Sequence, residues 1–433
     1  MRQGVRHASR LEGVVVPPGD KSISHRAALL NTIADGSAHV SNFCVGDDRS
    51  AMLQCLRGLG GQLRRHESCS VSGADECFEV TGLGIDGLQE PGDVLDAGNS
   101  GTTMRLVSGL LASQPFFSVI SGDGSLRNRP MARILNPLRM MGATVSGRQN
   151  GSLAPLVFQG GELTGIEYEM PVASAQLKSS ILIAGLAAAG ATTAVQPSAS
   201  RDHTERMMAA MGANISVNEL RVTVQASRLK SMDVNIPCDT SGASFWLVAA
   251  CAHPNASIRV NGVGINPTRT GVLTVLERMG ANIRIENVRE DAGEPSADLI
   301  AETSDLRGVE ISGDIIPAVI DELPVLALAA SVASGDTVIR DAAELRVKES
   351  DRIKATVEGL NRLGARVEET DDGMTIHGGS ALSGAEVRSR GDHRIAMTMA
   401  VAGLVATGET AIEQAEAADV SYPGFWETLA ALQ

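Results

Sequence analysis

The stretch MGANI occurs twice, at residues 211–215 and 279–283, and three close variants of it occur elsewhere in the chain. These variants are LGGQL at 59–63, MGATV at 141–145 and LGARV at 363–367. In each copy an amphipathic helical pattern precedes the glycine, and alternating apolar residues follow it. Glycine commonly ends a helix because it adopts a left-handed backbone conformation without strain. The repeat therefore predicts a helix, a glycine cap and a strand at five places.

A second series of predicted helices alternates with the first and occurs in six copies. Each copy begins with small or polar residues and continues as an apolar run, as in SAQLKSSILIAGLAAAG at residues 174–190. Such nearly uniform apolarity predicts helices that are buried on most sides and form the core. The predicted starts are Ser24, Ser100, Ser174, Ser241, Asp321 and Asp392.

The two series together predict six repeated units in an α/β (α+β) fold. A chain of 433 residues exceeds what one hydrophobic core supports, so we expect two similar domains of three units each. The sixth unit ends just after its second helix, and we expect the isolated apolar strand at residues 11–16 to supply its missing strand. The N-terminal domain would then span residues 17–238, and the C-terminal domain residues 1–16 plus 239–433.

The composition argues against several classes of protein. With 37 Lys and Arg against 51 Asp and Glu, a net charge of −14 and 3% aromatic residues, we expect no nucleic-acid partner. We also expect no membrane partner, because no run of about 18 uninterrupted apolar residues occurs. The first residues, MRQGVRHASRLEGVVV, lack the apolar stretch of a secretory signal, so we expect a cytoplasmic location.

Cofactor motifs are also missing from the sequence. The six cysteines show no CxxC spacing and no histidine at metal-ligand intervals, which predicts free thiols and no metal site. The segment GLGIDG at residues 82–87 matches GxGxxG, but Pro91 and Gly92 follow it instead of a helix. A dinucleotide site requires that helix, so we expect no such cofactor.

Cations occur where a helix would not favour them. The segment GDKSISHRAALL at residues 19–30 places Lys21 and Arg26 at a helix start, where the helix dipole is already positive. In one interpretation Ser22 or Ser24 caps the helix and both cations point into water. In the other, the cations share a bound anion with the free backbone N–H groups of the helix.

Equivalent places in the other units carry similar residues, which favours the anion. At the helix starts lie Asn99, Gly101, Thr102, Arg105, Ser174, Gln176, Lys178, Asp239, Ser241, Asp321, Glu322, Asp392, His393 and Arg394. In the loops before the amphipathic helices lie Asp47, Asp48, Arg49, Arg127, Arg129, Ser200, Arg201, Asp202, His203, Lys348, Glu349 and Arg352. Because a repeat stacks equivalent ends on one face, we expect several helix N-termini and cations to converge on an anionic ligand.

Single members of this set also have structural interpretations. Asp47 and Asp48 fit helix caps, and Asp202 and Glu205 fit a capping box at the start of their helix. His203 fits an ordinary residue of the same helix start.

Seven segments together resemble the 5-enolpyruvylshikimate-3-phosphate synthase family. They are GDKSISHRAALL, AGNSGTTMRLVSGLL, GDGSLRNRPM, SAQLKSSILIAGL, SRDHTERMM, RVKESDRI and GDHRIAMTMA, and they run through nearly the whole chain. The resemblance implies two domains, each of three βαβαββ units around buried parallel helices (an inverse β-prism), joined by a double-crossover hinge. The crossovers would lie near residues 17–21 and 237–240.

The resemblance also implies an activity in the shikimate pathway, which leads to chorismate and the aromatic amino acids. The enolpyruvyl group of phosphoenolpyruvate would pass to the 5-hydroxyl of shikimate 3-phosphate, with release of phosphate. The family performs this addition and elimination through a tetrahedral intermediate, without a metal or an organic cofactor. The implied partners are these two small molecules, and we expect a monomer.

The family's site residues match positions in this chain. Shikimate 3-phosphate would contact Lys21, Ser22, Arg26, Ser174, Ala175, Gln176, Ser200, Arg201, Asp321 and Lys348. Phosphoenolpyruvate would contact Lys21, Asn99, Gly101, Arg129, Gln176, Arg352 and Arg394. Asp321 and Glu349 would act as the acid and base, with help from Lys21.

Two other functions fit parts of the pattern. UDP-N-acetylglucosamine enolpyruvyl transferase shares the fold, but it typically has Lys-Asn at the first helix, where this chain has Lys21 and Ser22. It also has a Cys in the loop that reads GDGSLRNRP in this chain. A non-catalytic repeat scaffold with a basic groove would not require Asp321 and Glu349 among the cations.

Overall fold

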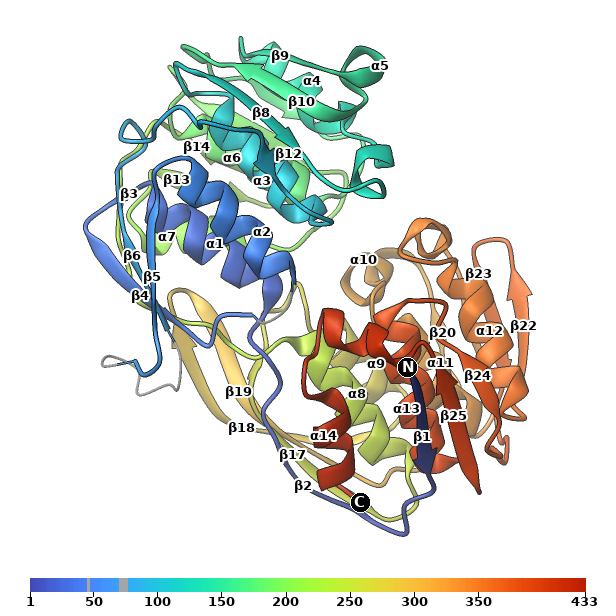
Figure 1. Cartoon of the computed structure of the whole chain (residues 1–433). Coiled ribbons are helices and arrows are strands. Elements are labelled where there is room, and N and C mark those ends of the chain that lie inside the picture. The colour runs from blue at the N-terminus through green and yellow to red at the C-terminus, as the bar shows by residue number, and fades with distance from the viewer. Residues whose placement is uncertain (45–46, 70–76) are drawn as a thin grey trace. The chain divides into compact units, whose positions relative to one another are not determined.

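The computed structural model describes residues 1–44, 47–69 and 77–433, with only the backbone described for Asp47 and Asp48. Its helices and small sheets form two compact units (Figure 1). The N-unit comprises residues 19–236 and 290–294, and the C-unit comprises residues 1–18, 237–289 and 295–433. The boundaries predicted from the sequence, at residues 17 and 238, each differ by two residues from those of the N-unit. The prediction placed residues 290–294 in the C-terminal domain, whereas the structure groups them with the N-unit.

Three sheets of the N-unit share one strand order. In each, a short first strand pairs in parallel with the strand that follows a buried helix, and two antiparallel strands follow. The first sheet contains β16 (Val234–Asn235), β4 (Ser37–Ser41), β6 (Cys77–Thr81) and β5 (Gln62–His66). The second contains β7 (Leu95–Asp96), β8 (Phe117–Ser121), β10 (Leu153–Gln159) and β9 (Thr144–Gly147). The third contains β11 (Glu167–Glu169), β12 (Thr192–Val195), β14 (Arg221–Val224) and β13 (Ile215–Asn218), and β15 (Leu229–Lys230) pairs separately with β3 (Ala34–Asp35).

The sheets of the C-unit follow the same order, which confirms the repeat. One sheet contains β2 (Leu11–Val15), β17 (Ala256–Gly264), β19 (Glu294–Glu302) and β18 (Asn282–Asp291). The turn that connects β18 to β19, residues 290–294, is assigned to the N-unit. The next contains β20 (Glu310–Ile311), β21 (Asp336–Ile339), β23 (Gly373–His377) and β22 (Arg366–Thr370). The last has three strands, β24 (Glu386–Arg388), β25 (Glu409–Glu413) and β1 (Arg2–Arg6).

The strand that completes the sixth unit is β1, so the expectation for residues 11–16 is wrong. β1 runs antiparallel to β25, with Arg2 opposite Glu413 (Figure 1). β2 instead pairs in parallel with β17 and supplies the first strand of the fourth unit. Sequence periodicity missed β1 because it buries a single side chain, that of Val5, and otherwise carries polar residues or glycine.

The helices follow the two predicted series. The buried helices are α1 (Lys21–Thr32), α3 (Gly101–Leu111) and α6 (Ala175–Gly185) in the N-unit, and α8 (Thr240–Ala252), α11 (Leu323–Val332) and α13 (His393–Val405) in the C-unit. The amphipathic helices are α2 (Asp47–Gly58), α4 (Ala132–Met140), α7 (His203–Ala210), α9 (Gly271–Arg278), α12 (Arg352–Arg362) and α14 (Phe425–Ala431). Shorter elements are α5 (Arg148–Gly151), α10 (Ile316–Val319) and the 3₁₀ turns Leu126–Asn128, Gly313–Ile315, Ala343–Val347 and Ala415–Val420.

The five repeated glycines end helices as predicted. Gly60, Gly142, Gly212, Gly280 and Gly364 all have positive φ values, from 87° to 106°. Each lies between an amphipathic helix and the strand that follows it. A side chain at these positions would strain the backbone, and this explains why the same short motif recurs.

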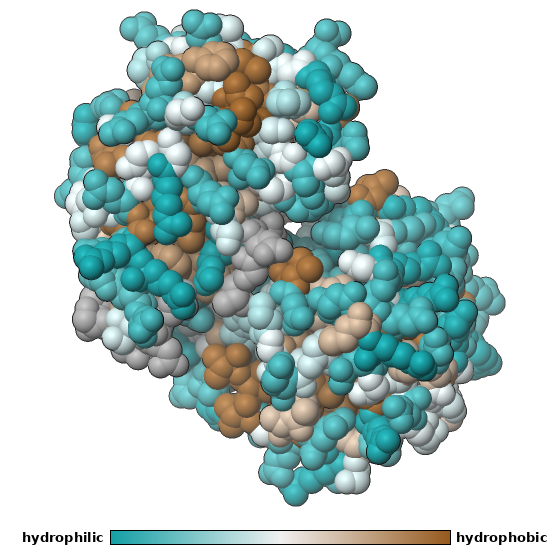
Figure 2. Space-filling view, in the orientation of Figure 1, coloured by the Kyte–Doolittle hydropathy of each residue, from teal (hydrophilic) through white to brown (hydrophobic). Residues whose placement is uncertain are grey.

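Each unit has its own hydrophobic core. One cluster of buried residues lies in the N-unit, and a second lies in the C-unit, where α8, α11 and α13 pack against one another. All six cysteines are free, as predicted, and the structure also places all six in buried positions. The face of the molecule in Figure 2 is mostly hydrophilic, with small separate hydrophobic patches.

In the part of the chain that the structure describes, no single helix is long and apolar enough to cross a membrane. One bent pair, residues 313–319 and 323–332 at 110°, meets this test by length and composition alone.

Candidate functional site

The residue that caps α1 is neither Ser22 nor Ser24, so that interpretation of the helix start is wrong. The N-cap is Asp20, whose carboxylate accepts a hydrogen bond from the backbone N–H of Ile23 at 2.9 Å. Ser22 and Ser24 lie inside the helix, where a side chain does not have the geometry of an N-cap. Ser24 instead donates a hydrogen bond to the carbonyl of Asp20 at 2.7 Å.

Arg26 lies deep in the N-unit rather than at its surface, with 3% of the residue exposed. Its guanidinium donates hydrogen bonds to Thr204 Oγ1 at 2.6 Å, Ser179 Oγ at 2.8 Å and the carbonyl of Ser22 at 2.8 Å. Burial lowers the pKa of Arg26 to about 10, although the carboxylate of Glu205 opposes this shift. Arg26 therefore joins α1, α6 and α7 and holds the start of α1 in place.

A buried ion pair supports the loop before α7. Lys178 Nζ lies 2.5 Å from Glu205 Oε1, and the two side chains are 1% and 5% exposed. Lys178 also donates a hydrogen bond to the carbonyl of Ser200 at 3.3 Å. The capping-box interpretation is therefore wrong, because a buried lysine requires a counter-ion and Glu205 supplies it. The side chain of Asp202 likewise makes no cap hydrogen bond.

The remaining predicted residues of the N-unit lie at helix starts or in this loop. Ser174 caps α6 by accepting a hydrogen bond from the backbone N–H of Leu177, and Ala175 is the first residue of that helix. Lys21 is the first residue of α1. Ser200 and Arg201 precede α7, and Ser200 donates a hydrogen bond to Gln196 Oε1 at 2.5 Å.

Two guanidinium groups flank the N-terminus of α3. A Cβ added at Gly101 would lie 3.3 Å from Nη1 of Arg105 and 3.5 Å from Nη1 of Arg129. Arg129 is held by Asn99, whose Oδ1 accepts a hydrogen bond from its Nη2 at 2.7 Å. Gln176 accepts a hydrogen bond from Arg105, which links α6 to this group. Free backbone N–H groups beside two cations form a site suited to an anion.

Arg105 was missing from the predicted ligand contacts. The available signal is its spacing: it lies four residues after Gly101, one helical turn along the same face. A glycine at a helix start followed by an arginine at this distance places the guanidinium over the free N–H groups.

In the C-unit a single buried arginine holds three carboxylates. Arg352 is 1% exposed, and its guanidinium lies 2.8 Å from Asp392 Oδ2 and 3.3 Å from Asp321 Oδ1. It also forms an ion pair with Glu349. Burial opposes ionisation of Glu349, Asp392 and Arg352. The attraction outweighs burial, so the pKa values of Glu349 and Asp392 lie below their ordinary values and that of Arg352 lies above its own.

Arg394 lies beside this cluster, and Lys348 has a different partner. Arg394 Nη1 donates a hydrogen bond to the carbonyl of Asp321 at 3.2 Å. Lys348 Nζ forms an ion pair with Glu344 Oε1 at 2.8 Å. The C-unit thus gathers Asp321, Arg352 and Arg394 with Glu349, whereas Lys348 is engaged elsewhere.

The pKa of Asp392 leads to a prediction about acid stability. Because this pKa is lower in the folded chain, the ionised group stabilises the fold above the unfolded value of 3.8, and the contribution is lost as pH falls through the lower value. We expect Asp392→Asn to reduce the free energy of unfolding at pH 7 by about 3 kcal/mol, as for one partner of a buried ion pair. Urea unfolding at pH 7, 5 and 3.5 should show this difference shrink below pH 3.8. A difference that stays constant with pH would contradict the electrostatic role.

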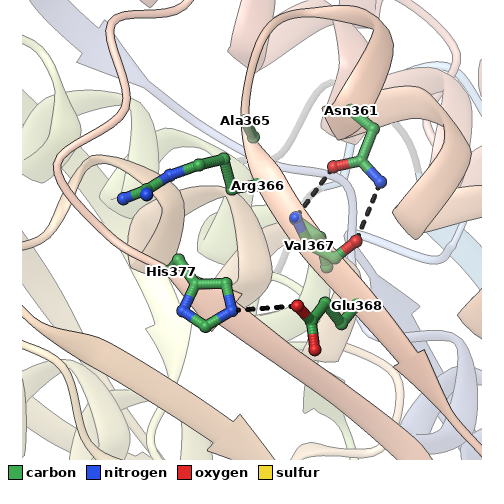
Figure 3. Close-up of a pocket in the computed structure, with 6 residues that line it drawn as sticks. All are labelled: Asn361, Ala365, Arg366, Val367, Glu368 and His377. Carbon is green, nitrogen blue, oxygen red and sulfur yellow. Dashed lines mark hydrogen bonds and ion pairs between the residues drawn. The ribbon is translucent and has the colours of Figure 1, made fainter.

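A surface hollow of about 470 Å³ lies elsewhere in the C-unit, at α12, β22 and β23. Figure 3 shows Asn361 bonded to the backbone of Val367 and His377 facing Glu368. Arg366, which also lines the hollow, donates a hydrogen bond to the carbonyl of Gly378 at 3.3 Å. The hollow contains none of the predicted site residues, and its polar groups already have partners. We therefore place the site at the charged clusters rather than at this hollow.

Two further predictions concern helix caps and metal ligands outside these clusters. The cap prediction for Asp47 and Asp48 concerns side chains outside the described residues. For the described residues, no group of three or more His, Cys, Asp or Glu side chains is arranged to hold a metal ion.

Comparison with known proteins gives a consistent result. The family model described as EPSP synthase (3-phosphoshikimate 1-carboxyvinyltransferase) matches residues 5–429. The 3-phosphoshikimate 1-carboxyvinyltransferase of Herpetosiphon aurantiacus is 49% identical, and the match covers 100% of both chains. That of Roseiflexus castenholzii is 52% identical over 97% of each chain. The solved EPSP synthase of Acinetobacter baumannii is 40% identical with a TM-score of 0.91, and the match covers 100% of this chain and 98% of the other.

Proposed function

Because the chain belongs to the EPSP synthase (3-phosphoshikimate 1-carboxyvinyltransferase) family, we propose that it transfers the enolpyruvyl group of phosphoenolpyruvate to the 5-hydroxyl of shikimate 3-phosphate. The hydroxyl oxygen bonds to C2 of phosphoenolpyruvate while C3 gains a proton, which gives a tetrahedral intermediate. The bond from C2 to the phosphate oxygen then breaks, C3 loses a proton and phosphate leaves. Each stage needs one group that donates a proton and one that accepts it.

The observation that supports this chemistry most directly is the pair of carboxylates on Arg352. Asp321 and Glu349, chosen from the sequence as the acid and base, both form ion pairs with this one guanidinium. Burial opposes ionisation of Glu349, but the charge of Arg352 outweighs it, so the pKa of Glu349 is lowered and its ionised form is favoured. We propose that it first accepts a proton and then returns one, with Asp321 and Lys21 as the other proton carriers.

We propose that the cations divide between the two substrates. In the N-unit, Gly101, Arg105 and Arg129 would bind phosphoenolpyruvate, with Asn99 and Gln176 holding the guanidinium groups. In the C-unit, Arg352 and Arg394 would serve the same substrate. Cations around the departing phosphate stabilise the charge that develops as the bond breaks.

Shikimate 3-phosphate would use a second set of residues. Ser174, Ser200 and Arg201 would hold its 3-phosphate, with Ala175 and Gln176 at the same helix start. Lys21 and Ser22 would face its carboxylate. Arg26, also predicted there from the sequence, is bonded inside the N-unit and would act by holding the start of α1. Asp321 and Lys348 would hold its ring hydroxyls, and Lys348 must then leave Glu344. The expectations of a cytoplasmic location, a monomer and a reaction without cofactor rest on the sequence and the family resemblance alone.

Isotope labelling tests the proposed transfer. The enzyme would be incubated with shikimate 3-phosphate and phosphoenolpyruvate labelled with ¹³C at C2. We expect the label to appear in an enol ether attached through the 5-oxygen, together with an equal amount of inorganic phosphate. Label that stays in phosphoenolpyruvate, or passes to free pyruvate, would contradict the proposal.

Loss of one guanidinium should separate the two substrates. We expect Arg129→Ala to weaken phosphoenolpyruvate binding about tenfold or more, because a charge-assisted hydrogen bond contributes roughly 1.5–3 kcal/mol. Titration calorimetry should show little change for shikimate 3-phosphate.

Lys178→Met is the matched control, because it also removes one cation from the N-unit. It removes the support of the Ser200 carbonyl, so it should weaken shikimate 3-phosphate more than phosphoenolpyruvate. Equal weakening of both ligands by either variant would contradict the division of the site.

A further inference from the structure

We propose that Glu322 is a positioning residue that sets the side chain of Arg394 for the anionic substrate. The inference rests on the proposed function, in which Arg394 binds phosphoenolpyruvate. Glu322 precedes α11 and directly follows Asp321, and it had no assigned role in the predicted site.

Burial makes the carboxylate of Glu322 unusual. Its side chain is 1% exposed, and Oε1 lies 3.7 Å from Nη1 of Arg394. Its second oxygen, Oε2, has no hydrogen-bond partner among the described residues. A buried charge without full hydrogen bonding costs free energy, so it persists where a nearby opposite charge compensates it. Arg394 supplies that charge, and its side chain is 13% exposed.

Arg394 lies between two carboxylates. Its Nη2 is 3.9 Å from Asp321 Oδ2, and its Nη1 is 3.7 Å from Glu322 Oε1. Both carboxylates attract the guanidinium, while the carbonyl of Asp321 accepts its hydrogen bond. Loss of the charge on Glu322 would leave the attraction of Asp321 alone. Arg394 would then shift from the position that suits phosphoenolpyruvate.

A chain of hydrogen bonds fixes Glu322 in turn. Ser241 Oγ donates a hydrogen bond to Glu322 Oε1 and accepts one from Arg269 Nη2 at 2.8 Å. Arg269 is 4% exposed, and it also donates to Asp239 Oδ1 at 3.0 Å. Asp239 caps α8, so the starts of α8 and α11 are joined at Glu322. This buried network prevents Glu322 from following Arg394 when a ligand enters.

Steady-state kinetics of Glu322→Gln tests the proposal. We expect the KM for phosphoenolpyruvate to rise about tenfold, within the range of coupling energies between residues of one network. The affinity for shikimate 3-phosphate should change by less than about twofold, because Arg394 is not among its proposed contacts. The kcat should fall by less than the KM rises, because Asp321 and Glu349 are both still present. Ser241→Ala should shift the same KM in the same direction, and it serves as the second variant if Glu322→Gln does not fold.

The matched control is Asp298→Asn, a similar loss of charge in the same unit. Asp298 is 10% exposed and pairs with Arg259 and Arg289, away from Arg394. We expect this variant to lose stability without a change in the KM for phosphoenolpyruvate.

A double-mutant cycle shows whether Glu322 acts through Arg394. In an Arg394→Lys background, Glu322→Gln should change the KM for phosphoenolpyruvate by less than about twofold, because the planar guanidinium that it positions is gone. The same tenfold change in both backgrounds, or an unchanged KM in the single variant, would overturn the proposal. Absence of turnover in the unaltered enzyme would instead overturn the proposed function, and this inference with it.

Discussion

Glu349→Gln and Asp321→Asn should each lower kcat by a factor of about 10² or more, as is typical when a general acid or base is lost. Each substitution keeps the size of the side chain and removes its ability to exchange protons. Both residues form ion pairs with Arg352, so the neutral amides also weaken that contact. The variants should still bind both substrates, because the proposed ligand contacts of the N-unit are unchanged and the amide in Asp321→Asn can still form hydrogen bonds with the ring hydroxyls.

Pre-steady-state measurement separates chemistry from binding in these variants. Titration calorimetry should give shikimate 3-phosphate affinities within a few-fold of the unaltered enzyme, while single-turnover rates fall. Glu344→Gln is a suitable control, since Glu344 is a neighbouring carboxylate that forms its ion pair with Lys348 rather than with Arg352. Near-normal turnover in both Glu349→Gln and Asp321→Asn would show that the acid and base lie elsewhere.

Arg352→Met should have the largest effect on stability. Methionine has a similar length without charge, so Asp392, which is 0% exposed, would lose the cation that favours its ionised form in the core. Removal of one partner from a buried ion pair typically costs about 3–5 kcal/mol. The variant should also lose activity, because Asp321 and Glu349 would lose their common partner.

A partly exposed arginine provides the comparison for Arg352. Arg346 pairs with Asp351 at 2.8 Å and Glu369 at 2.9 Å, and its side chain is 27% exposed. Arg346→Met should cost about 1 kcal/mol or less, because solvent screens such pairs. Urea unfolding of the two variants at pH 7 measures the difference. Equal losses would contradict the claim that the Arg352 cluster owes its strength to burial.

The repeat was predictable from the sequence because glycine caps and apolar runs act locally. A position with a left-handed backbone conformation between a helix and a strand favours glycine, as at Gly212 and Gly280, and glycine can be recognised in the sequence. An almost wholly buried helix such as α13 leaves an uninterrupted apolar run. These features depend on neighbours in the chain, and a single sequence contains them.

Features that depend on distant partners were not predictable in this way. β1 is recognisable as a strand through its pairing with β25, at the other end of the chain. The ion pair between Lys178 and Glu205 joins α6 to α7, and nothing in either segment alone distinguishes it from a surface charge or a helix cap. The same holds for Glu322, whose role depends on what surrounds Arg394.

The site was therefore predictable in its residue types more than in its contacts. The sequence indicated that cations gather at helix starts, and the structure places Arg105 and Arg129 beside Gly101. It did not indicate that Arg26 is bonded inside the N-unit or that Arg352 holds three carboxylates.

A phosphate-release assay with two alternative acceptors tests the central claim most directly. The purified enzyme would receive phosphoenolpyruvate with either shikimate 3-phosphate or UDP-N-acetylglucosamine, and inorganic phosphate would be followed over time. We expect phosphate release with shikimate 3-phosphate, none with UDP-N-acetylglucosamine, and a loss of at least about 10² in rate for Glu349→Gln. Release with UDP-N-acetylglucosamine alone, or with neither acceptor, would contradict the claim.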